Sequence, residues 1–139
     1  TYRYSGLSLQ PLPWHTRLQA IRERLERFTG SEFNSVLANA YRDGSDSMGW
    51  HSDDEPELGP KPVIASLSLG AERTFLVRPK KKPVSGNRES LKMVPAHGSL
   101  LLMRGLSQRL YQHAVPKTRR PVGLRINLTY RLVGLQEPV

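Results

Sequence analysis

Apolar residues near the start of the chain follow a helical pattern. Leu18, Leu25 and Phe28 belong to a series that recurs at steps of three and four residues, and charged residues fill the opposite face. Gly30 follows directly and is a typical helix stop. We therefore expect one amphipathic helix over residues 18–28.

Beyond Gly30 the pattern changes to short runs of β-forming residues separated by Gly, Pro, Asp and Asn. These runs cover residues 35–42, 63–69, 74–78, 91–94, 99–103, 111–115 and 124–133. One helix followed by several short strands predicts a mainly β (α+β) fold, in which the helix packs on an antiparallel sandwich or jelly roll. With 139 residues, the chain has the length of a single domain, residues 1–139.

Charge narrows the range of partners. Lys and Arg number 21 against 12 Asp and Glu, which favours an anionic partner such as nucleic acid, although solubility alone also explains many basic domains. Half of the acidic residues lie between positions 43 and 57. The basic residues form two clusters, one around a predicted hairpin loop (Arg73, Arg78, Lys80, Lys81, Lys82, Arg88 and Lys92) and one at Lys117, Arg119 and Arg120.

The chain has no cysteine, so any metal must be held by histidines and carboxylates. It also has no apolar stretch near the roughly 20 residues that span a bilayer, and no apolar run at its start. We expect an intracellular protein, cytoplasmic or nuclear, with no membrane partner.

A possible metal site lies at His51-Ser52-Asp53. In a strand, residues i and i+2 point to the same side, so the imidazole and the carboxylate can bind one metal ion together. Two histidines and one carboxylate leave open positions on non-haem iron(II) for a bidentate co-substrate and dioxygen. The third ligand must come from elsewhere, and a His and an Asp in a surface turn are the ordinary alternative.

The last predicted strand alternates strictly. Arg125, Asn127, Thr129 and Arg131 share one face, and the residues between them are apolar. This pattern describes either a half-solvated edge strand or a strand whose arginines point into a barrel and bind a dicarboxylic acid. Asn39 and Tyr41 share a face of an earlier strand, where they serve either the same ligand or the core.

Six ordered blocks carry a family resemblance. The chain resembles the AlkB-type iron(II)- and 2-oxoglutarate-dependent dioxygenases in Asn39-Ala40-Tyr41, His51 to Leu58, Ala65 to Gly70, Ala96 to Leu101, His113, and Arg125 to Arg131. The resemblance implies a double-stranded β-helix (jelly roll), with iron(II) as the cofactor and 2-oxoglutarate and dioxygen as co-substrates.

By this resemblance His51, Asp53 and His113 are the catalytic residues and iron ligands, and His97 has a structural role instead. The resemblance assigns the 2-oxoglutarate site to Asn39, Tyr41, Arg125, Asn127 and Arg131. Tyr41 and Arg125 are expected at the distal carboxylate, and Asn39 and Arg131 nearer the iron. Arginine suits this task because its charge survives burial and its donors match a carboxylate.

The implied activity is oxidative removal of alkyl groups from bases of DNA or RNA, single- or double-stranded, with release of formaldehyde, succinate and carbon dioxide. The resemblance begins within the N-terminal lid that covers the base, so that lid is expected to be truncated here, and we expect a monomer. The candidate substrate contacts are Tyr2, Tyr4, Trp50, Asp54 and Glu55. For each of them, ordinary packing, disorder at the N-terminus or tuning of the metal charge is the alternative.

Two other functions compete with this one. The first is a 2-oxoglutarate oxygenase that acts on a protein or a small molecule. Formaldehyde release from a methylated oligonucleotide distinguishes base demethylation from this alternative. The second is a non-enzymatic jelly-roll module that binds nucleic acid through its basic loops and binds no iron(II).

Overall fold

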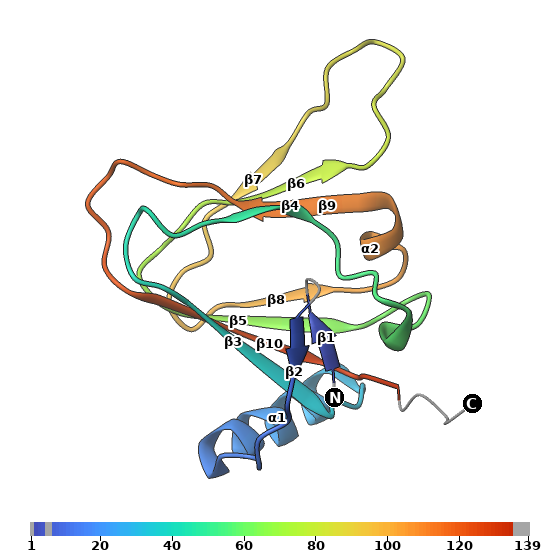
Figure 1. Cartoon of the computed structure of the whole chain (residues 1–139), viewed down its shortest axis with the longest axis vertical. Helices are drawn as coiled ribbons and strands as arrows, with labels where there is room; N and C mark the ends of the chain where they lie inside the picture. The colour runs from blue at the N-terminus through green and yellow to red at the C-terminus, as the bar shows by residue number, and fades with distance from the viewer. Residues whose placement is uncertain (1, 5–6, 135–139) are drawn as a thin grey trace.

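Two four-stranded antiparallel sheets face each other in the computed structural model, which describes residues 2–4 and 7–134 (Figure 1). The larger sheet has the order β3-β10-β5-β8 and the smaller one β4-β9-β6-β7. Their strands are β3 (Ser35–Tyr41), β4 (Met48–His51), β5 (Ile64–Gly70), β6 (Phe75–Pro79), β7 (Leu91–Met93), β8 (Leu100–Met103), β9 (Tyr111–Val115) and β10 (Arg125–Arg131). The jelly roll is therefore confirmed.

The predicted boundaries lie within two residues of the observed ones. Five elements had no counterpart among the predicted runs, because their sequences are short and carry no clear apolar periodicity. They are β4, the hairpin of β1 (Tyr2–Tyr4) and β2 (Leu7–Leu9), the 3-10 helix η1 (Pro56–Leu58) and the single-turn helix α2 (Ser107–Leu110).

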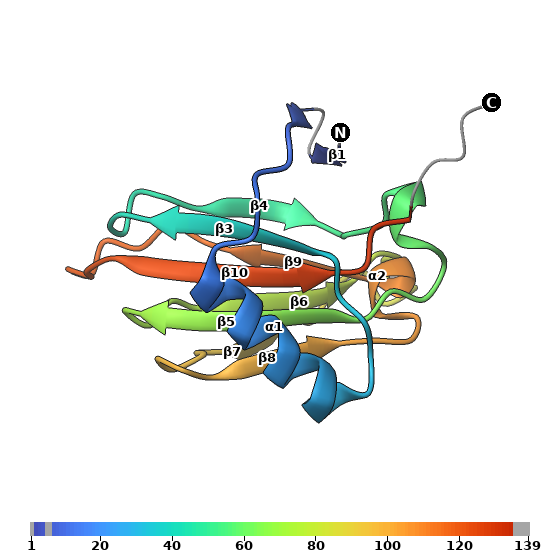
Figure 2. The same cartoon turned by 90° about the horizontal axis from the view of Figure 1, so that it is seen from below.

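Helix α1 (Thr16–Thr29) lies across the outer face of the larger sheet (Figure 2). His15 caps its start by accepting a hydrogen bond from the Arg17 amide, and Gly30 ends it in the left-handed conformation at φ 69°. The prediction for Phe28 was wrong, because its side chain is 75% exposed. It belongs to the last turn, which reaches beyond the β8 edge of the sheet (Figure 2).

The core under α1 is built on the apolar face of β10. Leu128 and Tyr130 are buried there with Leu25 and Phe33, and Trp14 stacks on Tyr130 with ring centroids 6.3 Å apart. The Tyr130 hydroxyl donates to the Leu18 carbonyl at 2.9 Å, so its polar atom is satisfied. Truncating an aromatic side chain in such a core costs about 3–5 kcal/mol.

A second, smaller core lies between the two sheets. Tyr41, Phe75 and Val115 are buried there, and methionines and other aliphatic side chains pack around them. The space between the sheets that this core leaves open contains the candidate site.

None of the helices within the described ranges has the length and apolar character needed to cross a bilayer.

Candidate active site

A cavity between the sheets is lined by the polar face of β10 and by residues of the facing strands. Its lining comprises Asn39, Tyr41, Met48, His51, Asp53, Ser66, Phe75, Met103, His113, Val115, Arg125, Asn127, Thr129 and Arg131. The structure thus brings together the eight residues that the resemblance assigns to iron and 2-oxoglutarate. The edge-strand alternative was wrong, because β10 is a central strand and Arg125 and Arg131 are 2% and 3% exposed.

Strand pairing explains why these side chains converge. In the register of the larger sheet, Arg125 lies opposite Tyr41 and Asn127 opposite Asn39. Residues that are directly opposite in an antiparallel pair point to the same face. The alternation read from β10 and β3 therefore describes one shared polar surface.

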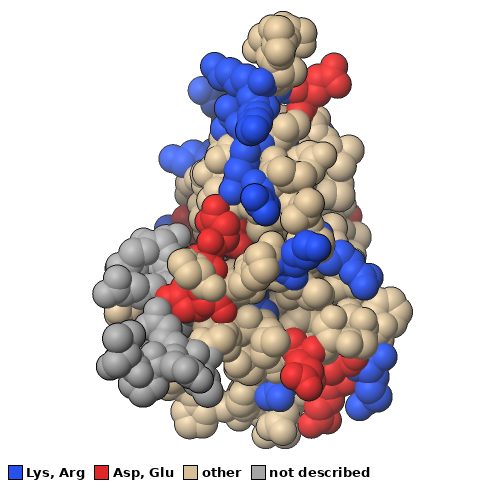
Figure 3. All heavy atoms as spheres, turned by 90° about the vertical axis from the view of Figure 1, so that its right-hand side faces the viewer, with Lys and Arg blue, Asp and Glu red and all other residues tan. Residues whose placement is uncertain are grey.

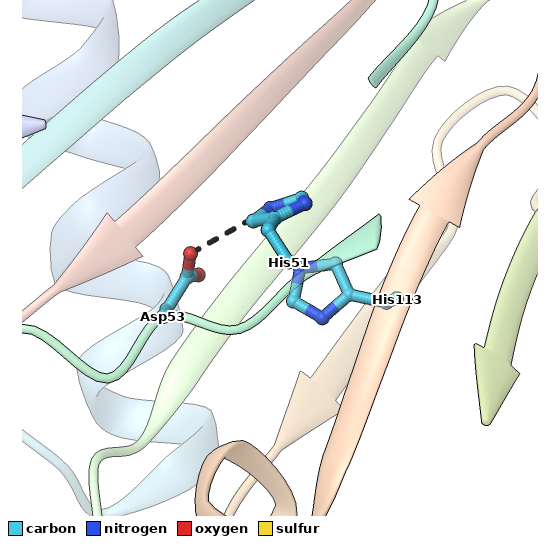
Figure 4. Close-up of side chains that lie close together, drawn as sticks. All are labelled: His51, Asp53 and His113. Atoms are coloured by element: carbon cyan, nitrogen blue, oxygen red, sulfur yellow. Dashed lines mark ion pairs between the residues drawn. The ribbon is translucent and has the colours of Figure 1, made fainter. Parts of the chain in front are cut away.

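The three candidate metal ligands lie close together (Figure 4), at the end of the cavity lining where Arg131 pairs with Asp53. His51 ends β4 and lies opposite His113 of β9, and the two rings are 4.2 Å apart between centroids. One ligand atom each from His51, Asp53 and His113 lies within 4.8 Å of the others. Two imidazoles and one carboxylate at this separation can hold a ferrous ion and leave positions open on it.

The strand-spacing argument for His51 and Asp53 was wrong in one respect. Strand β4 stops at His51, with an irregularity in its register, so Asp53 lies in the loop that follows and not on the same strand. Gln108 of α2 fixes that loop, because its side-chain oxygen accepts the Asp53 amide at 2.8 Å. The Ser52 hydroxyl also donates to the Tyr111 carbonyl.

Both imidazoles can present a ring nitrogen to a metal ion. The His51 Nδ1 lies 2.8 Å from the Gly49 carbonyl, which places the proton on Nδ1 and leaves the Nε2 lone pair, 3.8 Å from Asp53 Oδ1, for a ligand. Burial, reinforced by His51, lowers the pKa of His113 to about 4. His113 therefore carries no proton at neutral pH that a metal ion must displace.

The two carboxylate oxygens of Asp53 differ in their partners. Its Oδ2 accepts hydrogen bonds from Arg131 at 2.8 and 3.3 Å, and both side chains are buried. Its Oδ1 is buried and has no hydrogen-bond partner among the described residues. A divalent cation would satisfy this unpaired carboxylate oxygen beside two imidazoles.

At the other end of the cavity, Arg125 has donors to spare. Its Nη2 donates to Ser68 at 3.1 Å, and its guanidinium lies over the Tyr41 ring, 5.1 Å from the centroid. Its Nε and Nη1 are buried and find no acceptor in the described part of the chain. Buried donors without acceptors are costly, and a carboxylate would satisfy both. The cavity thus fits a metal at one end and an organic anion at the other.

Asn127 lies between these two ends and is satisfied internally. Its amide nitrogen donates to the Ser66 hydroxyl and the Leu67 carbonyl, and its oxygen accepts from Thr129. These contacts fix which way the amide faces. Ser66 and Ser68 were missed, although their spacing by two in β5 marks them as residues of one face.

Three candidate substrate contacts, Trp50, Asp54 and Glu55, lie outside the cavity lining. Trp50 is half-buried, with the Arg78 guanidinium 4.0 Å from its ring centroid, and Asp54 pairs with Lys80 at 2.9 Å. Burial raises the pKa of Glu55, and its Oε2 has no partner within the residues that the structure describes. Tyr2 and Tyr4 belong to β1, and their side chains lie outside the described part.

Other residues have structural roles. The His97 Nδ1 accepts the Gly70 amide at 2.9 Å, which confirms the structural role predicted for it. Arg73 does not join the exposed basic cluster, because it is 3% exposed and donates to backbone carbonyls. Gln108 and Phe75, which stacks on His113 at 5.3 Å, carried no signal in the sequence that separates them from ordinary polar and core residues.

Comparisons with known proteins agree with this geometry. The profile of the 2OG-Fe(II) oxygenase superfamily matches residues 1–131, and the chain belongs to that superfamily. It is 47% identical over 137 residues to the alpha-ketoglutarate-dependent dioxygenase alkB homolog 3 of Homo sapiens, a match that covers 95% of this chain and 48% of that protein. It is 43% identical to the DNA oxidative demethylase ALKBH2 of Mus musculus, over 96% of this chain and 57% of that protein.

Among solved structures, that of OsALKBH1 superposes with a TM-score of 0.51 at 26% identity, and the match covers 83% of this chain and 60% of that one. The resemblance to the AlkB-type dioxygenases is thus confirmed. The chain spans about half of the length of the curated relatives that it matches.

Proposed function

We propose that this chain oxidatively removes alkyl groups from bases of DNA or RNA, using iron(II), 2-oxoglutarate and dioxygen. The observation that carries the proposal is the single cavity with two differently equipped ends. A His-Asp-His triad with an unsatisfied carboxylate oxygen stands at one end, and Arg125 with two unsatisfied donors stands at the other. The name of the Mus musculus relative, a DNA oxidative demethylase, supports a nucleic-acid substrate.

The metal would be held by His51, Asp53 and His113. Arg131 holds the second oxygen of Asp53, so it orients that ligand. Bound iron(II), 2-oxoglutarate and dioxygen would together supply oxidation of an alkyl C–H bond, coupled to decarboxylation of the keto acid to succinate. The C–N bond of the hydroxylated alkyl group would then break to release an aldehyde, the electron pair returning to the base nitrogen and the hydroxyl proton passing to that nitrogen or to water.

For the co-substrate, we assign the distal carboxylate to Arg125 and Tyr41, and the keto-acid end to Asn39 and Arg131. The buried, unpaired Nε and Nη1 of Arg125 support the first assignment. The ion pair of Arg131 with the metal-facing Asp53 supports the second. Asn127, held by its own hydrogen bonds, would orient the molecule between these ends.

The nucleic acid would approach from the loop that follows His51. Glu55 has a buried oxygen without a partner in the described ranges, which suits a contact to the edge of a flipped base, and Asp54 and Trp50 lie on the same segment. We include Tyr2 and Tyr4 as further candidates, because the resemblance places an aromatic segment there.

Basic side chains would position the phosphates. Lys and Arg gather at the end of the molecule that carries the long loop between β6 and β7 (Figure 3). That loop contains Lys80, Lys81, Lys82 and Arg88, and Lys80 connects it to the metal-side loop through Asp54. We further propose that the chain acts as a single-domain monomer inside the cell.

The test is a mass-spectrometric screen of methylated single- and double-stranded oligonucleotides with iron(II), ascorbate and 2-oxoglutarate, with His51→Ala as the blank. The proposal predicts loss of the methyl mass and an equal amount of formaldehyde. Succinate formation without any demethylated base would favour the protein or small-molecule oxygenase. A protein that binds oligonucleotides but no iron(II) would be the non-enzymatic module.

A further inference from the structure

Arg73 is a buried cation that lies outside the cavity lining. It belongs to the turn between β5 and β6, and its guanidinium donates three hydrogen bonds to backbone carbonyls. Nη1 donates to Asp43 at 2.9 Å, and Nη2 donates to Asp46 and to Pro116, both at 2.8 Å. Three bonds from one guanidinium join segments that are far apart in the sequence.

These segments close the barrel at the end away from α2 (Figure 1). They are the β3–β4 loop (42–47), the β9–β10 loop (116–124) and the turn that carries Arg73 itself. The first two also touch directly, because the Thr118 amide donates to the Gly44 carbonyl at 2.9 Å, and a Cβ at Gly44 would collide with the Thr118 carbonyl. Through its three hydrogen bonds, Arg73 joins its own turn to both loops.

The same guanidinium reaches the co-substrate end of the cavity through Tyr41. Its central carbon lies 5.7 Å from the centroid of the Tyr41 ring, and that of Arg125 lies 5.1 Å from the same ring. Burial raises the pKa of Tyr41, and the two arginines oppose that rise, Arg125 more strongly than Arg73. Within the described cavity lining, the one carboxylate is Asp53, which Arg131 pairs.

We propose that Arg73 is a positioning residue that makes this cavity select keto acids with a second carboxylate. It does so in two ways: it holds the three segments together beside Tyr41, and it adds a second buried positive charge next to the Tyr41 ring. Arg73 does not touch the keto acid, so its effect reaches the ligand through Tyr41 and Arg125. This inference rests on the proposed function, since it takes 2-oxoglutarate as the ligand.

The test compares two keto acids that differ in the distal carboxylate, 2-oxoglutarate and 2-oxobutyrate. Their dissociation constants are measured by calorimetry on protein loaded with Mn(II), which avoids turnover. In Arg73→Gln we expect 2-oxoglutarate to bind about tenfold more weakly, as for loss of a partly screened cation, and 2-oxobutyrate to change less than about twofold. The preference for the dicarboxylate is therefore the quantity that falls.

Two further variants separate charge from loop order. Arg42→Gln is the matched control, because Arg42 anchors the same β3–β4 loop through Asp46 but is exposed. We expect it to leave both dissociation constants within about twofold of wild type. Arg73→Lys keeps the charge but cannot reach three carbonyls, so the preference should fall by about threefold. If Arg73→Gln does not fold, Arg73→Lys alone decides.

Equal weakening of both keto acids in Arg73→Gln would overturn the inference, as would a loss of preference in Arg42→Gln that matches it. An unchanged preference in Arg73→Lys would also overturn it. A wild-type protein that binds neither keto acid would instead contradict the proposed function. A wild type that prefers 2-oxoglutarate, with a variant that keeps the preference, would refute this inference alone.

Discussion

Strand β10 presents an apolar face to α1 and a polar face to the cavity, and the two faces differ in how completely their groups are satisfied. On the outer face, Tyr130 is fully buried and its hydroxyl is bonded to the Leu18 carbonyl. On the inner face, Arg125 is equally buried but has two donors without acceptors in the described chain. One strand thus separates folding stability from ligand binding, because the outer face is complete in the protein alone and the inner face is completed by a ligand.

The largest effect is expected at the metal end of the inner face. Asp53→Ala removes the oxygen aimed at the metal and should lower oligonucleotide demethylation by at least about 10³-fold, the scale of losing an essential catalytic group. Product formation by mass spectrometry and Mn(II) affinity by calorimetry measure this. Glu32→Ala removes an exposed carboxylate outside the cavity lining and is the control. Activity in Asp53→Ala near that of wild type would remove the triad from the mechanism.

On the outer face, Tyr130→Ala should lower the free energy of unfolding by about 3–5 kcal/mol, because it opens a cavity under α1 and removes a hydrogen bond. Urea denaturation measures this. The exposed Phe28 offers a matched control, since Phe28→Ala should change stability by less than about 0.5 kcal/mol. Equal losses in the two variants would mean that α1 does not pack as described.

Acid should lower the free energy of unfolding through the buried His113. Its folded-state pKa, about 4, lies below the ordinary histidine value, so the unfolded chain binds the proton more tightly. The metal-free protein should therefore lose stability as the pH falls from about 6.5 to about 4, by about 3 kcal/mol in total, and this contribution is absent above pH 6.5. Urea denaturation of wild type and His113→Asn across that range checks it, and parallel curves would contradict it.

Arg125→Met sharpens the comparison most directly. It should weaken 2-oxoglutarate binding by about 100-fold, because a buried charge-assisted carboxylate contact is lost. It should leave the stability of the metal-free protein equal or higher, because a buried, partly unpaired cation is replaced by an apolar side chain of similar length. Calorimetry and denaturation are the two readouts. A variant that is much less stable would place Arg125 among the structural residues of the core.

The smallest effect is expected far from both faces, at the β6–β7 loop. Replacing Lys80, Lys81 and Lys82 with Gln should weaken oligonucleotide binding severalfold at low salt and flatten its salt dependence by up to about three charges. Stability should stay within about 1 kcal/mol, since the Lys80–Asp54 pair is partly exposed. Binding that keeps its full salt dependence would reject a role for this loop.

Much of this arrangement could be predicted, because it depends on local periodicity. The alternation of Arg125, Asn127, Thr129 and Arg131 already separated the two faces of β10, and the resemblance of six blocks identified which face binds ligand. The residues that lie beside this face, on β3 and β5, follow from strand pairing, and a single sequence does not encode that pairing locally.

Other features depend on contacts between distant segments and could not be predicted. Gln108, in a helix of one turn, accepts a hydrogen bond from the Asp53 amide. The sequence places Arg73 in an exposed basic cluster, but in the structure it is buried and donates to three backbone carbonyls. The irregular pairing of β4 likewise decides how His51 and Asp53 converge, and no periodic pattern marks it.

The central claim is that the metal and the keto diacid occupy one cavity together. Calorimetric titration of 2-oxoglutarate into the protein with and without Mn(II) tests it most directly. We predict one equivalent of 2-oxoglutarate per chain, bound at least about tenfold more tightly with the metal than without it, and loss of this coupling in His51→Ala. Equal affinity in both conditions, or no binding of Mn(II), would contradict the claim.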